Sequence, residues 1–117
     1  MKQNGSIDGY TEAIWTGVTT LTLAKAMEES LRENLTGIYN LVNNKSISKY
    51  DLCSLFNKYF RNSELVVNPN DNLKLDKSLR CSRSDFSFVV PSYEQQIKEM
   101  REWIDLHLAL YPHYHVI

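Results

Sequence analysis

Only two short segments of this chain have the composition of β-strands, and two strands alone make a weak sheet. Residues 37–43 (GIYNLVN) and 64–69 (ELVVNP) are rich in β-branched and aromatic residues and are followed by turn-forming residues. We expect Pro69 to end the second strand. Because a two-stranded sheet is marginal in water, helices or further strands from elsewhere must cover it. The sequence therefore predicts a fold that is incomplete by itself.

Three helices are predicted from capping residues and apolar spacing. Thr19 or Thr20 caps the first helix, Ser48 the second, and Ser92 the third, which we expect to end near Pro112. Each helix has an apolar stripe that we expect to be buried. The stripes are Leu23, Ala24, Met27 and Leu31; then Leu52, Leu55, Phe56 and Tyr59; and then Tyr93, Ile97, Met100, Ile104 and Leu108.

The remaining segments have no sustained periodicity. Residues 1–17 are rich in Gly, Ser, Thr, Asn and Asp and are expected to form a loop or a truncated leading segment, while residues 73–90 have no clear assignment. A chain of 117 residues has room for one core but not for two. We predict a single α/β domain with a loop at 1–14, a core at 15–111 and a tail at 112–117.

Composition and charge exclude several classes of function. Apolar residues at 43% and charged residues at 23% are typical of a globular protein, and a net charge of -1 gives no field that would attract nucleic acid or an acidic membrane. No apolar run approaches the roughly 20 residues that span a bilayer, and the first residues do not resemble a signal peptide. We expect a cytoplasmic protein in which Cys53 and Cys81 are reduced thiols.

Four blocks of sequence resemble the C-terminal part of dTDP-4-dehydrorhamnose reductase and its relatives among the extended short-chain dehydrogenases. Residues 15–24 (WTGVTTLTLA) are similar to the family's W-x-G-x-T-T-x-x-L-A start of a helix. The other blocks are residues 37–43 with the serine-led helix start at 47–52 (ISKYDL), residues 75–79 (LDKSL), and residues 91–93 (PSY) with the helix that follows. They occur in the order that the family has.

The resemblance implies the substrate-binding domain of a nucleotide-sugar reductase, with three main helices, two or more short strands and no Rossmann domain. In that family the Rossmann domain binds NAD(P)H and supplies a Tyr-x-x-x-Lys pair, and the whole enzyme reduces a nucleotide-linked 4-keto sugar. This sequence has no Tyr-x-x-x-Lys, and its four glycines do not form a dinucleotide-binding motif. We therefore expect no catalytic residues and no cofactor in this chain, and as partners a Rossmann domain from elsewhere or a second copy.

Five residues are candidates for binding a nucleotide-linked sugar, weakly or as a half-site. Trp15, Thr19 and Thr20 offer an aromatic face and hydroxyls to a sugar or base, and Lys77 and Arg80 offer cations to a pyrophosphate. Alternatively, the first three form a buried anchor and a helix cap, and the two cations belong to a solvated face that nearby aspartates balance. Family members often have an arginine at the position of Asn68. The contact that this arginine makes in the family therefore has no counterpart in this chain.

Other readings of the sequence remain open. Related epimerases and dehydratases have similar C-terminal parts, and a non-catalytic interaction module that binds through a face around Tyr10, Ile14 and Trp15 is a different class of function. His113 and His115 suggest a metal site, but no carboxylate or cysteine lies near them, so an exposed tail is favoured and no metal is expected.

Overall fold

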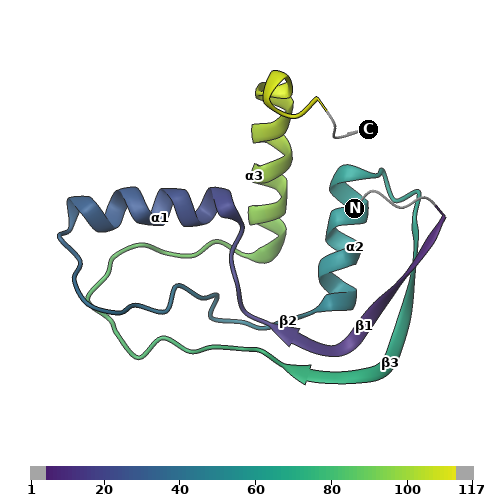
Figure 1. Cartoon of the computed structure of the whole chain (residues 1–117), viewed down its shortest axis with the longest axis horizontal. Helices are drawn as coiled ribbons and strands as arrows, with labels where there is room; N and C mark the ends of the chain where they lie inside the picture. Colours follow the sequence, from purple (N-terminus) through teal and green to yellow (C-terminus); the bar gives the residue numbers. More distant parts are fainter. Residues whose placement is uncertain (1–4, 113–117) are drawn as a thin grey trace.

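The structure, a computed structural model, describes residues 5–112 and confirms the α/β class. It contains three helices and a small sheet with the strand order β2-β1-β3 (Figure 1). The elements are β1 (Ser6–Trp15), α1 (Thr20–Arg32), β2 (Ile47–Ser48), α2 (Lys49–Phe60), β3 (Val66–Asp76), α3 (Tyr93–Leu106) and a 3-10 turn (Leu108–Leu110).

The central strand β1 is the element that the sequence analysis missed. It pairs in parallel with β3 and, at Ile14 and Trp15, antiparallel with β2. The expectation of a loop at residues 1–17 is therefore wrong for Ser6–Trp15. The strand forms because of its long-range pairing with β3, which its Gly- and Asp-containing sequence does not reveal.

Helix α2 packs closely against β1 because β1 has small residues at the contact. A Cβ atom on Gly9 would lie 2.8 Å from Tyr50 Cα, and Ala13 is buried. Figure 1 shows α2 standing over the long ribbon of β1 and β3. The small side chains that weaken the strand signal in the sequence are thus the ones that admit the helix.

Strand β3 extends further than predicted, and Pro69 does not end it. The N–H of Val66 donates to Gly5 O, on the β1 side of the strand, at 2.9 Å. Because backbone groups alternate along a strand, position 69 faces the free edge, where a missing N–H breaks no pairing. The pairing continues through an irregularity between Tyr10 and Glu12 and reaches Asp76.

Residues 37–43, by contrast, do not form the predicted strand. Their one backbone–backbone hydrogen bond among the described residues runs from Asn43 N to Thr16 O at 2.9 Å. The segment is irregular and pairs with none of the three strands. Its strand-like composition therefore has no partner within residues 5–112.

The predicted helix caps are confirmed. Thr19, Ser48 and Ser92 each accept a hydrogen bond in the side chain from the backbone N–H three residues on. In α3, Ile97 and Ile104 are buried as predicted, but the helix ends at Leu106 and Leu108 is exposed. The stripe of α2 is only half-buried, although β1, β3 and α3 all contact this helix.

Helix α1 contradicts the prediction of a buried apolar stripe. Leu23, Met27 and Leu31 are 42%, 59% and 79% exposed, whereas Thr22 and Ala26 are buried. Hydrophobic spacing identified the apolar face of the helix correctly but not the direction in which it points. Figure 1 shows α1 projecting to one side, away from the sheet.

The buried core is small for a chain of this length. The buried apolar residues in the described part are Ala13, Ala26, Ile47, Leu65, Ile97 and Ile104. The Cα radius of gyration is 15.9 Å, against about 13 Å for a compact chain of this size. Within residues 5–112, no helix combines the length and apolar character needed to cross a bilayer. The molecule is open and flat, as the predicted dependence on outside elements implies.

Candidate functional site

The segment between β1 and α1 lies at a junction of three parts of the chain that are distant in sequence. Thr16 is buried, and its backbone oxygen accepts from Asn43 N. Its hydroxyl accepts from Leu79 N at 2.9 Å and lies 3.3 Å from Leu79 O, to which it can donate. Thr16 therefore holds the end of β1 between residues 40–43 and residues 77–80.

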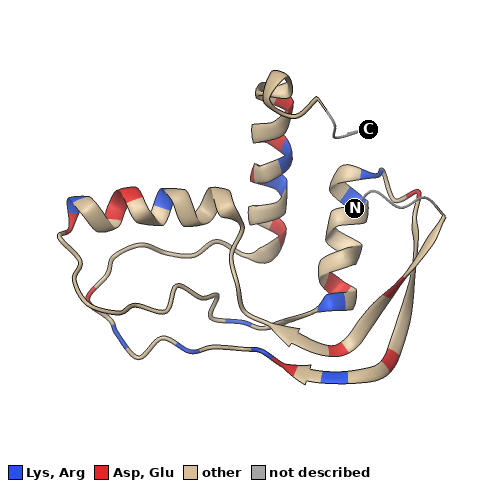
Figure 2. Ribbon diagram, in the orientation of Figure 1, with Lys and Arg blue, Asp and Glu red and all other residues tan. Residues whose placement is uncertain are grey.

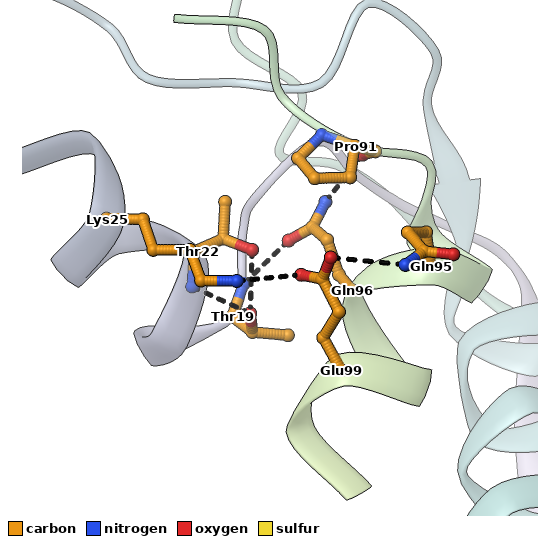
Figure 3. A network of polar contacts seen from close by, with 7 residues as sticks. All are labelled: Thr19, Thr22, Lys25, Pro91, Gln95, Gln96 and Glu99. Atoms are coloured by element: carbon orange, nitrogen blue, oxygen red, sulfur yellow. Dashed lines mark hydrogen bonds and ion pairs between the residues drawn. The ribbon is translucent and has the colours of Figure 1, made fainter. Parts of the chain in front are cut away.

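Gln96 connects this junction to α3. Its side chain, 2% exposed, accepts from Thr19 N at 2.9 Å and donates to Pro91 O, also at 2.9 Å (Figure 3). Asn43 Nδ2 donates to the same Pro91 oxygen at 2.8 Å. In the described residues no buried side-chain nitrogen or oxygen lacks a partner. A buried polar network that is fully satisfied fixes the starts of α1 and α3 relative to each other.

Thr19 is thus occupied within the chain. Its hydroxyl accepts from Thr22 N at 3.2 Å, and its backbone N–H donates to Gln96. Nearby, Lys25 pairs with Glu99 at 3.4 Å on the surface between the two helices, as Figure 3 shows. Thr20, the first residue of α1, is exposed.

Trp15 presents a half-buried aromatic surface at the end of β1. A Cβ atom on Gly17 would lie 2.7 Å from Trp15 Nε1 and closer still to two ring carbons, so only glycine fits beneath the indole. The Lys49 ammonium lies 5.3 Å from the ring centroid, a cation–π distance. The ring centroid of Tyr93, the first residue of α3, lies 6.2 Å from that of Trp15. Burial raises the pKa of the Tyr93 phenol.

Lys77 and Arg80 lie in the segment that directly follows β3 and forms part of the junction. Lys77 N donates to Ile14 O at 2.9 Å, and Arg80 O accepts from Asn40 Nδ2 at 3.0 Å, while both side chains are exposed. Figure 2 shows basic residues spaced along the chain after β3. The structure therefore brings the backbone of residues 77–80 beside Trp15, whereas Thr19 and Thr20 lie at the start of α1.

An open pocket of about 420 Å³ lies elsewhere, between α1 and residues 87–89. It is lined by Lys25, Glu28, Glu29, Arg32, Ser87, Phe88 and Val89, none of which was a predicted site residue. Arg32 is paired with Glu28 and Glu29, so its charge is already compensated. The pocket is bounded by a clamp in which the Glu33 carboxylate accepts from both the N–H and the hydroxyl of Ser87.

The strand–turn–helix formed by β1, Gly17 and α1 does not fit a dinucleotide cofactor. A phosphate needs space over the glycine and free N–H groups at the helix start. Here the indole of Trp15 fills the space over Gly17, and the N–H groups of Thr19 and Thr22 are bonded within the chain. The described residues likewise contain no cluster of three metal-ligating side chains, and His113 and His115 lie outside them.

Thr16, Asn43 and Gln96 are residues of the junction that the sequence analysis missed. Thr16 and Asn43 lie within the quoted blocks 15–24 and 37–43, so the blocks marked the right segments. Nothing in the sequence marks Gln96 as a buried residue, because it resembles any polar residue on a helix. Its role depends on the bond to Thr19, which is 77 positions away.

The fold is similar to part of two solved dTDP-4-dehydrorhamnose reductase structures. The crystal structure of dTDP-4-dehydrorhamnose reductase from Bacillus anthracis str. Ames in complex with NADP matches 82% of this chain with a TM-score of 0.67 at 15% identity. The dTDP-4-dehydrorhamnose reductase from Clostridium acetobutylicum ATCC 824 matches 88% of it with a TM-score of 0.55 at 16% identity. The resemblance inferred from the four blocks is thus confirmed in the fold.

This similarity covers a minority of each solved chain. The chain spans 37% of the first structure and 39% of the second. Neither a protein-family model nor a curated protein sequence matches it. More than half of each matched structure has no counterpart here.

Proposed function

We propose that this chain is the nucleotide-sugar-binding C-terminal part of a dTDP-4-dehydrorhamnose reductase-like, NAD(P)H-dependent oxidoreductase of the short-chain dehydrogenase class. The observation that carries the proposal is the fold similarity to two such reductases, one of them in complex with NADP. The four sequence blocks support it independently of the coordinates. In this proposal the chain acts in the cytoplasm, in deoxysugar and surface polysaccharide synthesis, and does not catalyse reduction by itself.

The geometry supports different roles for the candidate residues. Trp15, which is half-buried, offers the exposed part of its indole to the sugar or base, and the Lys49 ammonium over the ring adds a positive charge. The exposed side chains of Lys77 and Arg80 are available to a pyrophosphate. Thr20 offers a hydroxyl, while Thr19 positions α1 instead of contacting the ligand. The hydride would come from NAD(P)H on a dinucleotide-binding domain, toward which this chain would present the sugar.

A non-catalytic interaction module is the second candidate. The outward apolar face of α1 favours it, since large exposed apolar faces mark protein interfaces. An epimerase or dehydratase parent would use the same fold, and the residues that distinguish these reactions lie outside this chain.

Thermal melting of the purified chain with dTDP-, UDP- and GDP-linked sugars tests the proposal. A ligand that binds only the folded chain stabilises it by about 2.7 kcal/mol at a concentration of 100 Kd, so we expect a rise in Tm that one nucleotide produces selectively. Free NADP should cause no rise, because the indole of Trp15 leaves no space for a phosphate over Gly17. A cooperative melt that no nucleotide sugar shifts would favour the interaction module.

A further inference from the structure

Basic side chains without an ion-pair partner gather around the end of β1. Within residues 5–112, no carboxylate lies at ion-pair distance from Lys45, Lys49, Lys77 or Arg80, whereas Lys98 on α3 is an isolated cation of this kind. The basic residues that do pair with a carboxylate are Lys25, Arg32, Lys58, Lys74, Arg83 and Arg101. A chain with a net charge of -1 thus has a local excess of positive charge at one place.

The register of the sheet places these cations on both sides of the end of β1. Ile14 pairs with Ser48 of β2 on one side and with Asp76 of β3 on the other. Lys49 and Lys77 are the residues that directly follow these two positions. Because neighbouring strands are about 4.8 Å apart, the two positions lie roughly 10 Å from each other, so both lysine side chains can reach one ligand. Figure 2 shows basic residues at the start of α2 and directly after β3.

Lys45 and Lys77 extend from backbone that is held in place. Lys45 N donates to Asn43 Oδ1 at 3.1 Å, and Lys45 O accepts from the Tyr93 hydroxyl. Lys77 N donates to Ile14 O at 2.9 Å. Cations on a fixed backbone lose less conformational freedom when they bind an anion than cations on a mobile loop.

The neighbouring carboxylates leave most of this positive charge uncompensated. The Asp76 carboxylate accepts from the N–H and the hydroxyl of Ser78, at 2.9 Å and 2.5 Å, and its charge offsets part of that of Arg80. Asp51 lies two residues after Lys49, a spacing at which side chains on a helix do not face each other. The lysines therefore provide most of the charge that is available to a ligand.

We propose that Lys45 and Lys49 on one side of β1, with Lys77 and Arg80 on the other, bind two linked phosphates of a ligand whose remaining part contacts Trp15. Cations on both sides of the strand can contact two linked phosphates at once, whereas a single phosphate reaches one side only. Lys45 and Lys49 complete the set of cations that Lys77 and Arg80 begin. The identity of the group attached to the phosphates, a sugar or a base, rests on the proposed function.

Calorimetric titration of the purified chain with inorganic pyrophosphate tests the inference. At one ionic strength, pyrophosphate should bind about tenfold more tightly than inorganic phosphate, and its affinity should fall as salt is added because the cations are exposed. The double variant Lys45→Gln/Lys49→Gln should bind pyrophosphate about tenfold more weakly at an unchanged Tm. Lys98→Gln is the matched control and should leave the affinity unchanged. No binding of pyrophosphate, equal binding of phosphate, or an equal loss in the control would overturn the inference.

The nucleotide sugars separate this inference from the proposed function. If pyrophosphate binds as expected but no nucleotide sugar raises Tm selectively, the phosphate site stands and the proposed function fails. If a nucleotide sugar binds selectively and the double variant keeps its affinity for it, the inference fails and the proposed function stands. A mixed-sequence oligonucleotide that binds more tightly than any nucleotide sugar would overturn the inference, because it would assign the cations to a polymer.

Discussion

The indole of Trp15 lies directly against the backbone of Gly17, in the space that any side chain at position 17 would need. The ring is thereby fixed between the turn before α1 and the Lys49 ammonium. This contact explains the joint presence of tryptophan and glycine in the W-x-G block in steric terms. It also makes the orientation of Trp15 open to a direct test.

Gly17→Ala should displace the indole and lower the free energy of unfolding by about 1–3 kcal/mol, as overpacking typically does. The measurement is urea denaturation followed by tryptophan fluorescence. In the double variant Trp15→Ala/Gly17→Ala the clash is gone, so the two effects should be clearly less than additive. Simple additivity would show that the two residues do not interact as described.

Gln96→Leu should destabilise the chain by about 1–3 kcal/mol, because it leaves the half-buried Thr19 N–H without an acceptor. The matched control is Gln95→Leu, whose side chain is exposed and bonds Glu99 on the surface of α3. The control should stay within about 0.5 kcal/mol of the parent. Equal losses for the two variants would contradict the structural role given to Gln96.

Thr19→Ala and Thr20→Ala separate helix capping from ligand contact. Loss of the Thr19 cap should cost about 1 kcal/mol of stability, whereas Thr20→Ala should change stability little because its side chain is exposed. Nucleotide-sugar affinity, measured by calorimetry, should fall with Thr20→Ala. A stable Thr19→Ala chain that loses affinity would reverse these assignments.

Arg80→Gln should weaken nucleotide-sugar binding about tenfold or more without lowering Tm, because a charge-assisted bond to phosphate contributes about 1.5–3 kcal/mol. The Arg80 side chain is exposed, and its backbone oxygen, which Asn40 contacts, is unchanged by the substitution. Lys98→Gln removes the same charge on α3 and serves as the control. If both variants bind equally well, Arg80 does not contact the ligand.

The clamp between Glu33 and Ser87 should open in acid. The two hydrogen bonds from Ser87 hold the pKa of Glu33 below its ordinary value of about 4.3. A carboxyl whose pKa is lowered by folding stabilises the fold above its unfolded pKa, and that contribution is lost as the pH falls through the folded pKa. Amide exchange at Ser87 should therefore rise below about pH 4. Glu33→Gln should remove this pH dependence, and its persistence in that variant would assign it to another group.

The parts of the fold that were predictable are those whose signals are local. Thr19, Ser48 and Ser92 each cap a helix through a contact three residues away, so the sequence contains both partners. Strand β1 was missed because its partner begins at Val66, opposite Ser6, and no local pattern encodes that pairing. Apolar spacing likewise located the stripe on α1 but not what covers it.

The residues of the candidate site likewise fall into those that the sequence reveals and those that only the folded structure reveals. Block 15–24 contains Trp15 and block 75–79 contains Lys77, while Arg80 was noticed as a neighbouring cation that could meet a pyrophosphate. The network that joins them to α3 depends on Asn43 and Gln96, whose partners are known only once the chain is folded. Buried polar residues at ordinary helix and loop positions carry no such signal.

The position of Pro69 on the free edge of β3 has a consequence for how this open molecule behaves in a crowded cell. An unprotected strand of this length would offer a template on which copies could stack into fibres. Pro69 has no N–H to offer an incoming chain, and the N–H of Asn72 is already bonded to the Asn70 side chain at 2.9 Å. The edge strand is thus guarded against fibrous aggregation at positions 69 and 72, and the outer face of α1 stays open to a partner.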